Sequence, residues 1–140
     1  MGVSSDGILV FGFEIESDEY GDGGYPDFLI DTNGDDSTID FDDFVLEKAG
    51  YDGHGCDYDA KRKVIEACPA DLTMHCSYDF PMYILAVRGT EIRASRGHPT
   101  KITQEQLSIS QERIDAFKKW CVSVGILHQE PEWILCSMYG

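Results

Sequence analysis

Basic residues are almost missing from the first sixty positions of this chain. Residues 1–60 contain a single one, Lys48, beside 17 aspartates and glutamates, which gives this segment a formal charge of −16. Residues 61–140 contain 10 basic and 9 acidic residues, so the net charge of −15 belongs almost entirely to the first segment. A chain this negative repels phosphate groups, and we therefore expect no direct binding to nucleic acid or to an anionic membrane.

Long hydrophobic runs are also missing. No apolar stretch approaches the roughly 20 residues that a membrane-spanning helix needs. The start, MGVSSDGILVFG, has no basic segment before its apolar residues and no small-residue cleavage site, so a secretory signal is not expected there. We therefore expect a cytoplasmic protein. Its five cysteines, an odd number, are expected to be reduced thiols, most of them buried.

Standard catalytic motifs are missing too. The chain has no G-x-S-x-G nucleophile motif, no P-loop and no dinucleotide-binding fingerprint. The best enzyme hypothesis rests on His75, Ser77, Tyr78 and Arg88, polar residues that stand beside apolar segments. Their spacing defines no reaction, and we expect no catalytic activity.

What the sequence does contain is the patterning of one globular domain, 1–140, with an acidic N-terminal half. Its 42% of hydrophobic residues is enough for a core. Apolar alternation or continuous apolar runs predict strands at 8–15, 72–77, 82–87, 91–95 and 133–138, and a short one at 27–30. Helical spacing predicts helices near 40–49, 59–67 and 111–124. The first is expected to bury the stripe Phe41, Phe44, Val45 and Ala49, and the second to bury Val64 and Ile65. Ser110 is expected to be the N-cap of the third helix, and Gly125 to end it. This order of strands and helices predicts an α+β fold, an antiparallel sheet of about five strands with about three helices mainly on one side.

The same patterns predict which side chains are buried. The strand at 8–15 is expected to face the core with its more apolar face, which carries Leu9, Phe11, Phe13 and Ile15. In the strand at 72–77, Cys76 is expected in the core and His75 on the other face. The pair Gly89-Thr90 fits the two-residue turn of a hairpin between its flanking strands.

The segment 31–43, DTNGDDSTIDFDD, resembles a calcium-binding loop. EF-hand loops place oxygen ligands in the pattern D-x-[DN]-x-[DN]-G-x5-E, and dockerin-type loops close with an aspartate. Here Asp36 replaces the glycine. The candidate ligands are the side chains of Asp31, Asn33, Asp35 and Asp42 and the carbonyl of Ser37. The sequence favours the alternative, a solvated acidic loop without a cofactor, whose aspartates stabilise turns and a helix start.

Three stretches of the chain resemble a group of small acidic proteins encoded by bacteriophages. These stretches are the opening MGVSSDGILVFGF, the centre MHCSYDFPMYILAVRG followed by ASRGHP, and the ending FKKWCVSVGI and PEWILCSMYG. The members of this group are similar to the chain in three features: a Met-Gly-Val/Ala-Ser-x-Asp-Gly start, a His-Cys-Ser…Pro-Met-Tyr centre and a Trp-rich final strand. The resemblance implies a phage origin and a role in the cytoplasm of the host cell, and it brings no activity and no catalytic residues.

The charge distribution favours an interaction protein. An array of carboxylates binds the basic, nucleic-acid-binding face of another protein for the Coulombic reason that this face binds DNA. The expected partner is a basic host protein, and the expected role is that of a host-takeover or anti-defence inhibitor, of an anti-CRISPR or DNA-mimic kind. The candidate partner-binding residues are Asp18, Glu19, Asp22, Asp35, Asp36, Asp40, Asp42 and Asp43. The alternative is an acidic accessory domain whose charge serves only solubility.

If the segment 31–43 binds calcium, millimolar Ca²⁺ is expected to raise the melting temperature, because a ligand that binds only the folded state stabilises it. The substitution Asp31→Ala removes a ligand and is expected to abolish the rise. Calorimetry of both proteins with and without calcium measures the effect. An unchanged melting temperature of the wild type in calcium contradicts the calcium loop.

Overall fold

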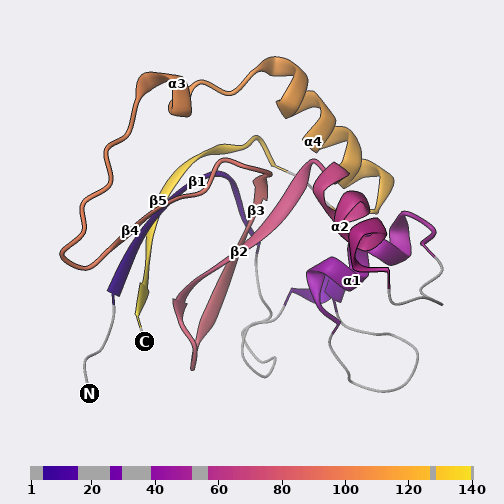
Figure 1. The fold of residues 1–140 in the computed structure, drawn as a ribbon, viewed down its shortest axis with the longest axis horizontal. Helices are drawn as coiled ribbons and strands as arrows, with labels where there is room; N and C mark the ends of the chain where they lie inside the picture. Colours follow the sequence, from indigo (N-terminus) through magenta and orange to yellow (C-terminus); the bar gives the residue numbers. More distant parts are fainter. Residues whose placement is uncertain (1–4, 16–25, 30–38, 52–56, 127–128, 140) are drawn as a thin grey trace.

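The chain forms a single mixed sheet, mostly antiparallel, with helices packed against it, which confirms the predicted α+β fold (Figure 1). A computed structural model describes residues 5–15, 26–29, 39–51, 57–126 and 129–139. In chain order the elements are β1 (Ser5–Ile15), the 3-10 helix η1 (Asp27–Leu29), α1 (Phe41–Lys48), α2 (Tyr58–Ala67), β2 (Ala70–Ser77), β3 (Pro81–Val87), β4 (Ile92–Ser95), α3 (Gln104–Leu107), α4 (Gln111–Ser123) and β5 (Glu132–Tyr139). Within these ranges no helix is long and apolar enough to cross a membrane.

The sheet closes on itself because β1 pairs along its length with three other strands. The strand order is β3-β2-β5-β1-β4, and β1 has an additional antiparallel ladder with β3. Residues 5–12 of β1 pair with β5, whereas residues 12–15 pair with β3. Since β2 joins β3 to β5, the ladders β1–β5, β5–β2, β2–β3 and β3–β1 form a closed ring. Figure 1 shows the strong curvature that this closure requires.

The predicted hairpin at Gly89-Thr90 is wrong. Strands β3 and β4 lie one after the other along the same edge of β1, β3 opposite residues 12–15 and β4 opposite residues 6–9. The residues between them bulge away from β1, and Thr90 fills the gap in the ladder. Its hydroxyl accepts a hydrogen bond from the Phe11 amide (3.2 Å) and donates one to the Val87 carbonyl (2.8 Å). A side chain thus replaces a missing backbone partner, which the turn signal alone does not reveal.

Closure of the ring creates two cores, one on each face of β1. On the helix side Phe13 is buried, and Phe11 and Ile15 pack against the same core, as predicted. Inside the ring, Ile8 and Val10 are fully buried, although they lie on the face that the sequence predicts to be less buried. That part of the prediction is wrong because the opposite wall of the ring covers these side chains.

The helix predictions are largely confirmed. In α1 the buried residues are Phe41, Phe44 and Val45, three of the four residues of the predicted apolar stripe, whereas Ala49 at the end of the helix is exposed. In α4 the Ser110 hydroxyl accepts a hydrogen bond from the Arg113 amide, which confirms the predicted N-cap. Helix α2 is less buried than predicted, since none of its residues is fully covered.

The predicted short strand at 27–30 is wrong. Residues 27–29 form η1, and the Leu29 amide donates to the Pro26 carbonyl at 3.0 Å, so this segment turns instead of extending. The turn buries Leu29 completely in the helix-side core, and it brings Phe28 to 5.2 Å from Phe44, measured between ring centroids. A local hydrogen bond and two apolar contacts therefore determine this segment.

Gly12 allows β1 to cross close to β3. A Cβ atom at this position would overlap the Leu85 carbonyl oxygen and would lie 2.7 Å from Ala86 Cα. At Gly7, on the same strand, the nearest atom to a Cβ is the Ala94 carbonyl oxygen at 3.9 Å. Only at Gly12 does the ring therefore require the absence of a side chain.

We expect Gly12→Ala to lower the free energy of unfolding by about 1–3 kcal/mol or more, because the backbone of β3 cannot move away without opening the ring. Gly7→Ala, which finds space, is the matched control and is expected to change it by less than about 1 kcal/mol. Urea unfolding of the three proteins measures the difference. Equal midpoints for the two variants contradict the close crossing.

Candidate functional site

The sequence-predicted site residues fall into two groups. Asp40, Asp42 and Asp43 lie in the part of the chain that the structure describes. The others lie outside the described residues: Asp18, Glu19, Asp22, Asp31, Asn33, Asp35, Asp36 and Ser37. The calcium loop therefore stays a prediction. Of the predicted acidic surface, the part around α1 lies within the described residues.

The N-cap residue and the solvent-exposed side of helix α1 carry four exposed carboxylates, which together we call the acidic face of α1. It consists of Asp40, Asp42, Asp43 and Glu47. None of these four makes an ion pair with another residue among those described. The first-turn residues Asp42 and Asp43 are favoured by the helix dipole, but Asp43 and Glu47 stand four residues apart and repel each other.

Lys48 does not neutralise this face. Its Nζ lies 5.5 Å from the centroid of the Phe44 ring, a cation–π contact at the end of α1. It forms no ion pair with any residue in the described ranges, although it is the only basic residue of the acidic segment. Lys48 therefore does not pair with the carboxylates of α1.

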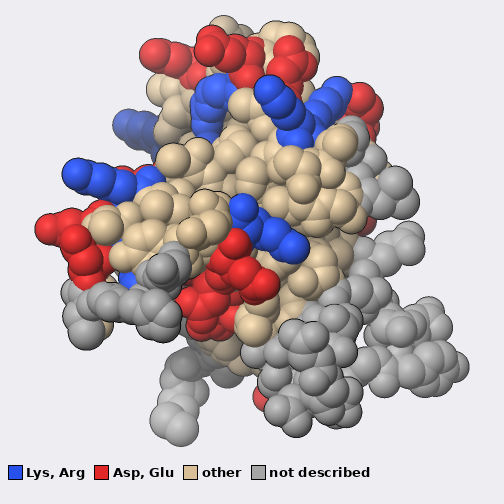
Figure 2. Space-filling model, turned by 90° about the vertical axis from the view of Figure 1, so that its right-hand side faces the viewer, with Lys and Arg blue, Asp and Glu red and all other residues tan. Residues whose placement is uncertain are grey.

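The acidic face is more limited than the sequence suggests. Asp57 is the N-cap of α2, and its carboxylate accepts a hydrogen bond from the Ala60 amide at 3.2 Å. The helix itself carries a basic run at residues 61–63. Figure 2 accordingly shows Lys and Arg interspersed with Asp and Glu around an uncharged area on the side of the helices. Glu14 lies on β1 near His75, away from α1. On the described residues, concentrated negative charge therefore belongs to α1.

The enzyme hypothesis does not find its residues together. His75 and Ser77 lie near the end of β2, whereas Arg88 follows the far end of β3, where Val87 pairs with Ala70 at the start of β2. Tyr78 is 72% exposed. The Ser77 hydroxyl accepts a hydrogen bond from the Phe80 amide at 3.0 Å, within the turn between β2 and β3.

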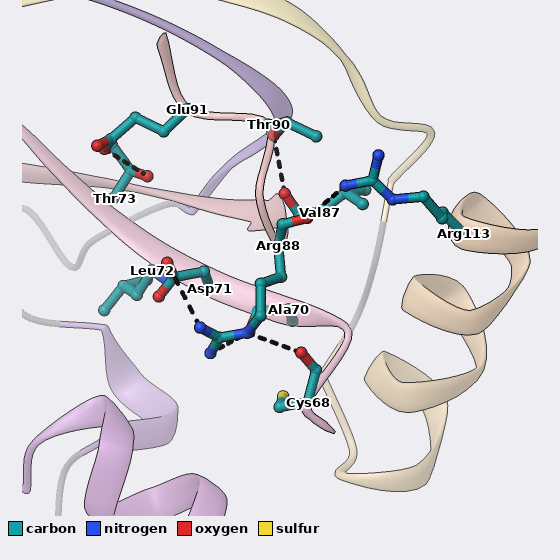
Figure 3. A network of polar contacts seen from close by, with 10 residues as sticks. All are labelled: Cys68, Ala70, Asp71, Leu72, Thr73, Val87, Arg88, Thr90, Glu91 and Arg113. Carbon is teal, nitrogen blue, oxygen red and sulfur yellow. Dashed lines mark hydrogen bonds and ion pairs between the residues drawn. The ribbon is translucent and has the colours of Figure 1, made fainter. Parts of the chain in front are cut away.

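Arg88 has a structural contact network instead (Figure 3). Its Nε donates to the Cys68 carbonyl at 2.8 Å and its Nη2 to the Ala70 carbonyl at 3.1 Å. These bonds hold the segment that leads from α2 into β2. Arg113 of α4 donates in turn to the Arg88 carbonyl at 2.6 Å, so one network joins α2, β2, β3 and α4. The guanidinium is used by the fold and is not free for an anionic ligand.

His75 and Cys76 have the reverse of their predicted burial. His75 is only 8% exposed and its Nε2 is buried without a hydrogen-bond partner, whereas Cys76 is half-buried. Thr73 lies opposite Ile84 in the ladder between β2 and β3, and His75 is two residues further along β2. His75 therefore lies on the same face of the sheet as Ile84, inside the ring. Burial lowers the pKa of His75, and the nearby Glu14 carboxylate partly opposes this shift. Cys76 has a positive φ of 77°, a strained conformation for a residue with a side chain.

The buried thiols are poor nucleophiles. Burial raises the pKa of Cys121 to about 12, and it also raises the pKa of Cys68. Both lie in the helix-side core and form no disulfide. No group of three or more His, Cys, Asp or Glu side chains in the described part of the chain is placed to hold a metal ion.

A groove between α1, α2 and α4 is a feature that the sequence analysis missed. Its volume is about 450 Å³, and its walls are mainly apolar, with Val64, Pro69, Trp120 and Val124 among the lining residues. Three helices contribute to it, so no spacing within one segment could have revealed it. The described residues that line the groove supply no set of converging polar groups, and this distinguishes it from a typical ligand site.

Comparisons with protein-family models, with curated proteins and with solved structures find no match to this chain.

The buried His75 predicts a pH dependence of stability. Because its pKa in the folded state lies below the ordinary value of 6.5, the unfolded state takes up a proton first as the pH falls below 6.5. The unfolding free energy is then expected to fall more steeply in the wild type than in His75→Leu between about pH 7.5 and about pH 5.5. Urea unfolding measures this, with His98→Leu at an exposed position as the control. Parallel pH profiles for wild type and His75→Leu contradict it.

Proposed function

We propose that this protein is a non-catalytic binding protein whose acidic face of α1 engages a basic surface of a partner protein. The observation that carries the proposal is that Asp40, Asp42, Asp43 and Glu47 are all exposed and unpaired with other described residues. Four carboxylates on one short helix form a compact negative surface, which fits a cluster of Lys or Arg on another protein.

The spacing of Asp43 and Glu47 is unfavourable by itself, although the helix dipole favours Asp43, and solubility alone does not require this spacing. The pair Asp43 and Glu47 destabilises α1 by about 0.2–0.5 kcal/mol, since like charges four residues apart repel. Solubility needs net charge but not this spacing, and a Lys at either position would remove the repulsion. Retaining both carboxylates is therefore consistent with a partner that supplies the missing positive charge.

The kind of partner follows from the same electrostatics. A basic surface that accepts several clustered carboxylates also accepts the phosphates of DNA or RNA, so the favoured partner is a nucleic-acid-binding protein. Binding to that surface would exclude nucleic acid, and the protein would act as an inhibitor. Its resemblance to phage-encoded proteins makes a host defence complex or the host transcription machinery the proposed target, in the host cytoplasm.

The test is affinity capture from a bacterial host lysate at low salt, followed by elution with duplex DNA. DNA is expected to release the partner, because it competes for the same basic surface. The double substitution Asp43→Asn with Glu47→Gln is expected to weaken binding by tenfold or more with little change in the melting temperature, because relief of the repulsion within α1 is offset by the lost interaction of Asp43 with the helix dipole. Titration calorimetry with the captured partner measures the affinity at several salt concentrations.

The matched control is Glu105→Gln with Glu112→Gln, which removes the same two charges from the exposed first turns of α3 and α4. This control is expected to bind as the wild type does. An affinity that does not change between low and high ionic strength, or equal losses in both double variants, contradicts binding through the acidic face of α1.

A further inference from the structure

The sheet carries an uncovered face at the end away from α1 and α2, formed by β5, β1 and β4 (Figure 1). The register places Leu135, Leu9 and Ile92 in one row across the three strands, because Leu9 pairs with both of the others. Residues directly opposite each other in a ladder point to the same side of the sheet. We call this row of large apolar side chains the ridge.

The next row on the same face contains only small residues. Gly7 pairs with Ser137 on β5 and with Ala94 on β4, and it lies two positions from Leu9 along β1. We call this row the low row. The ridge and the low row are thus parallel neighbours, separated by about 7 Å along the strands.

The ridge is exposed although β5 and β1 lie inside the sheet, with β4 at its edge. Leu135 is 78% exposed in the middle of β5, and Leu9 and Ile92 are only half-buried. The row on the other side of the ridge consists of Phe11 and Trp133, whose ring centroids lie 5.3 Å apart. The segment around α3 covers this row, because the Trp133 Nε1 donates a hydrogen bond to the Leu107 carbonyl. The covering therefore stops one row before Leu135.

This face also carries no charge. In a chain with 26% charged residues, none of the side chains that β5, β1 and β4 direct to this face is Asp, Glu, Lys or Arg. The charged residues of these strands take the alternate positions, and Asp6 and Arg93 form an ion pair there with an N–O distance of 3.2 Å. Charge has thus been kept off one of the most exposed apolar areas of the protein.

The absence of charge decides which occupant fits. A basic partner finds no carboxylate here, so this face offers no charge complementarity to it. A second copy of this chain also carries a net charge of −15 and is repelled wherever two negative surfaces meet. If two copies meet through β5, β1 and β4, their acidic α1 helices lie at opposite ends of the dimer, where they repel each other least.

The two rows are also complementary to each other. A two-fold axis parallel to the rows and midway between them places the ridge of each copy over the low row of the other. Gly7, Ala94 and Ser137 leave room for the Leu135 side chain, so that two sheets can approach to about 10 Å. Such an isologous contact is the commonest way in which proteins form dimers. We propose that this face is the interface of a homodimer.

The first test is the mass of the protein in solution as a function of concentration, by sedimentation equilibrium or light scattering. The wild type is expected to approach twice the 15.7 kDa of one chain as its concentration rises. Leu135→Asp is expected to weaken the dimer by at least tenfold, because it buries an unpaired charge at the two-fold contact. Leu135→Ser, which adds no charge, is expected to weaken it less.

The matched control is Val122→Asp, which adds the same charge at a residue of α4 that is 65% exposed and lies outside this face. It is expected to dimerise nearly as the wild type does, and melting curves of all variants confirm that they are folded. Dimerisation is also expected to strengthen with salt, the opposite of binding to a basic partner, because salt screens repulsion between the copies.

A wild type that stays monomeric at every concentration overturns the proposal. Equal weakening by Leu135→Asp and Val122→Asp overturns it as well, since this would be an effect of net charge. The inference does not depend on the acidic face of α1, because Asp43→Asn with Glu47→Gln leaves the ridge and the low row unchanged.

Discussion

The close crossing of β1 over β3 at Gly12 is the contact on which the rest of the structure depends. Because β1 can approach β3 without a side chain between them, it pairs with β5 in one half and with β3 in the other, and the sheet closes into a ring. Closure buries a small core inside the ring around Val10 and Ile84, and leaves the outer face of β1 for the helices. A single strand therefore contributes to both cores, and hydrophobic burial on its two faces is the main stabilising term.

The same closure separates two kinds of surface. The helices pack on one part of the outer face of the sheet, and α1 carries its unpaired carboxylates there. The part of the sheet that the helices do not reach presents Leu135 and its neighbours without any charge. A long-range Coulombic surface and a short-range apolar surface thus lie at different ends of the protein, so each can act without interfering with the other. This separation makes dimerisation compatible with binding a basic partner.

Local signals in the sequence were sufficient for α1, α2, α4 and most strands, but they did not identify the short helices η1 and α3. Ser110 at the start of α4, Gly125 after its end and the stripe around Phe44 are all determined within one or two turns of chain, and all are confirmed. The ring is not local, because it joins residues 5–12 to residues 132–139, and no periodicity records such a pairing. For that reason the burial of Ile8 and His75 and the bulge at Thr90 were missed. Of the candidate site, the sequence identified the carboxylates of α1 but not the basic run of α2 that limits them.

The pairing of β1 with β5 has a consequence for how the chain reaches its fold. Strand β1 is synthesised before the other described strands, but its longest ladder uses the last described strand, more than a hundred residues later. Until β5 is present, Val10 and Leu9 have no partner strand on that side, and an early product exposes an apolar edge. Folding of the ring therefore waits until β5 has been made, and the many contacts between distant residues predict a slow final step. The many carboxylates that precede α1 in the sequence are expected to oppose association between incomplete chains, because like charges repel.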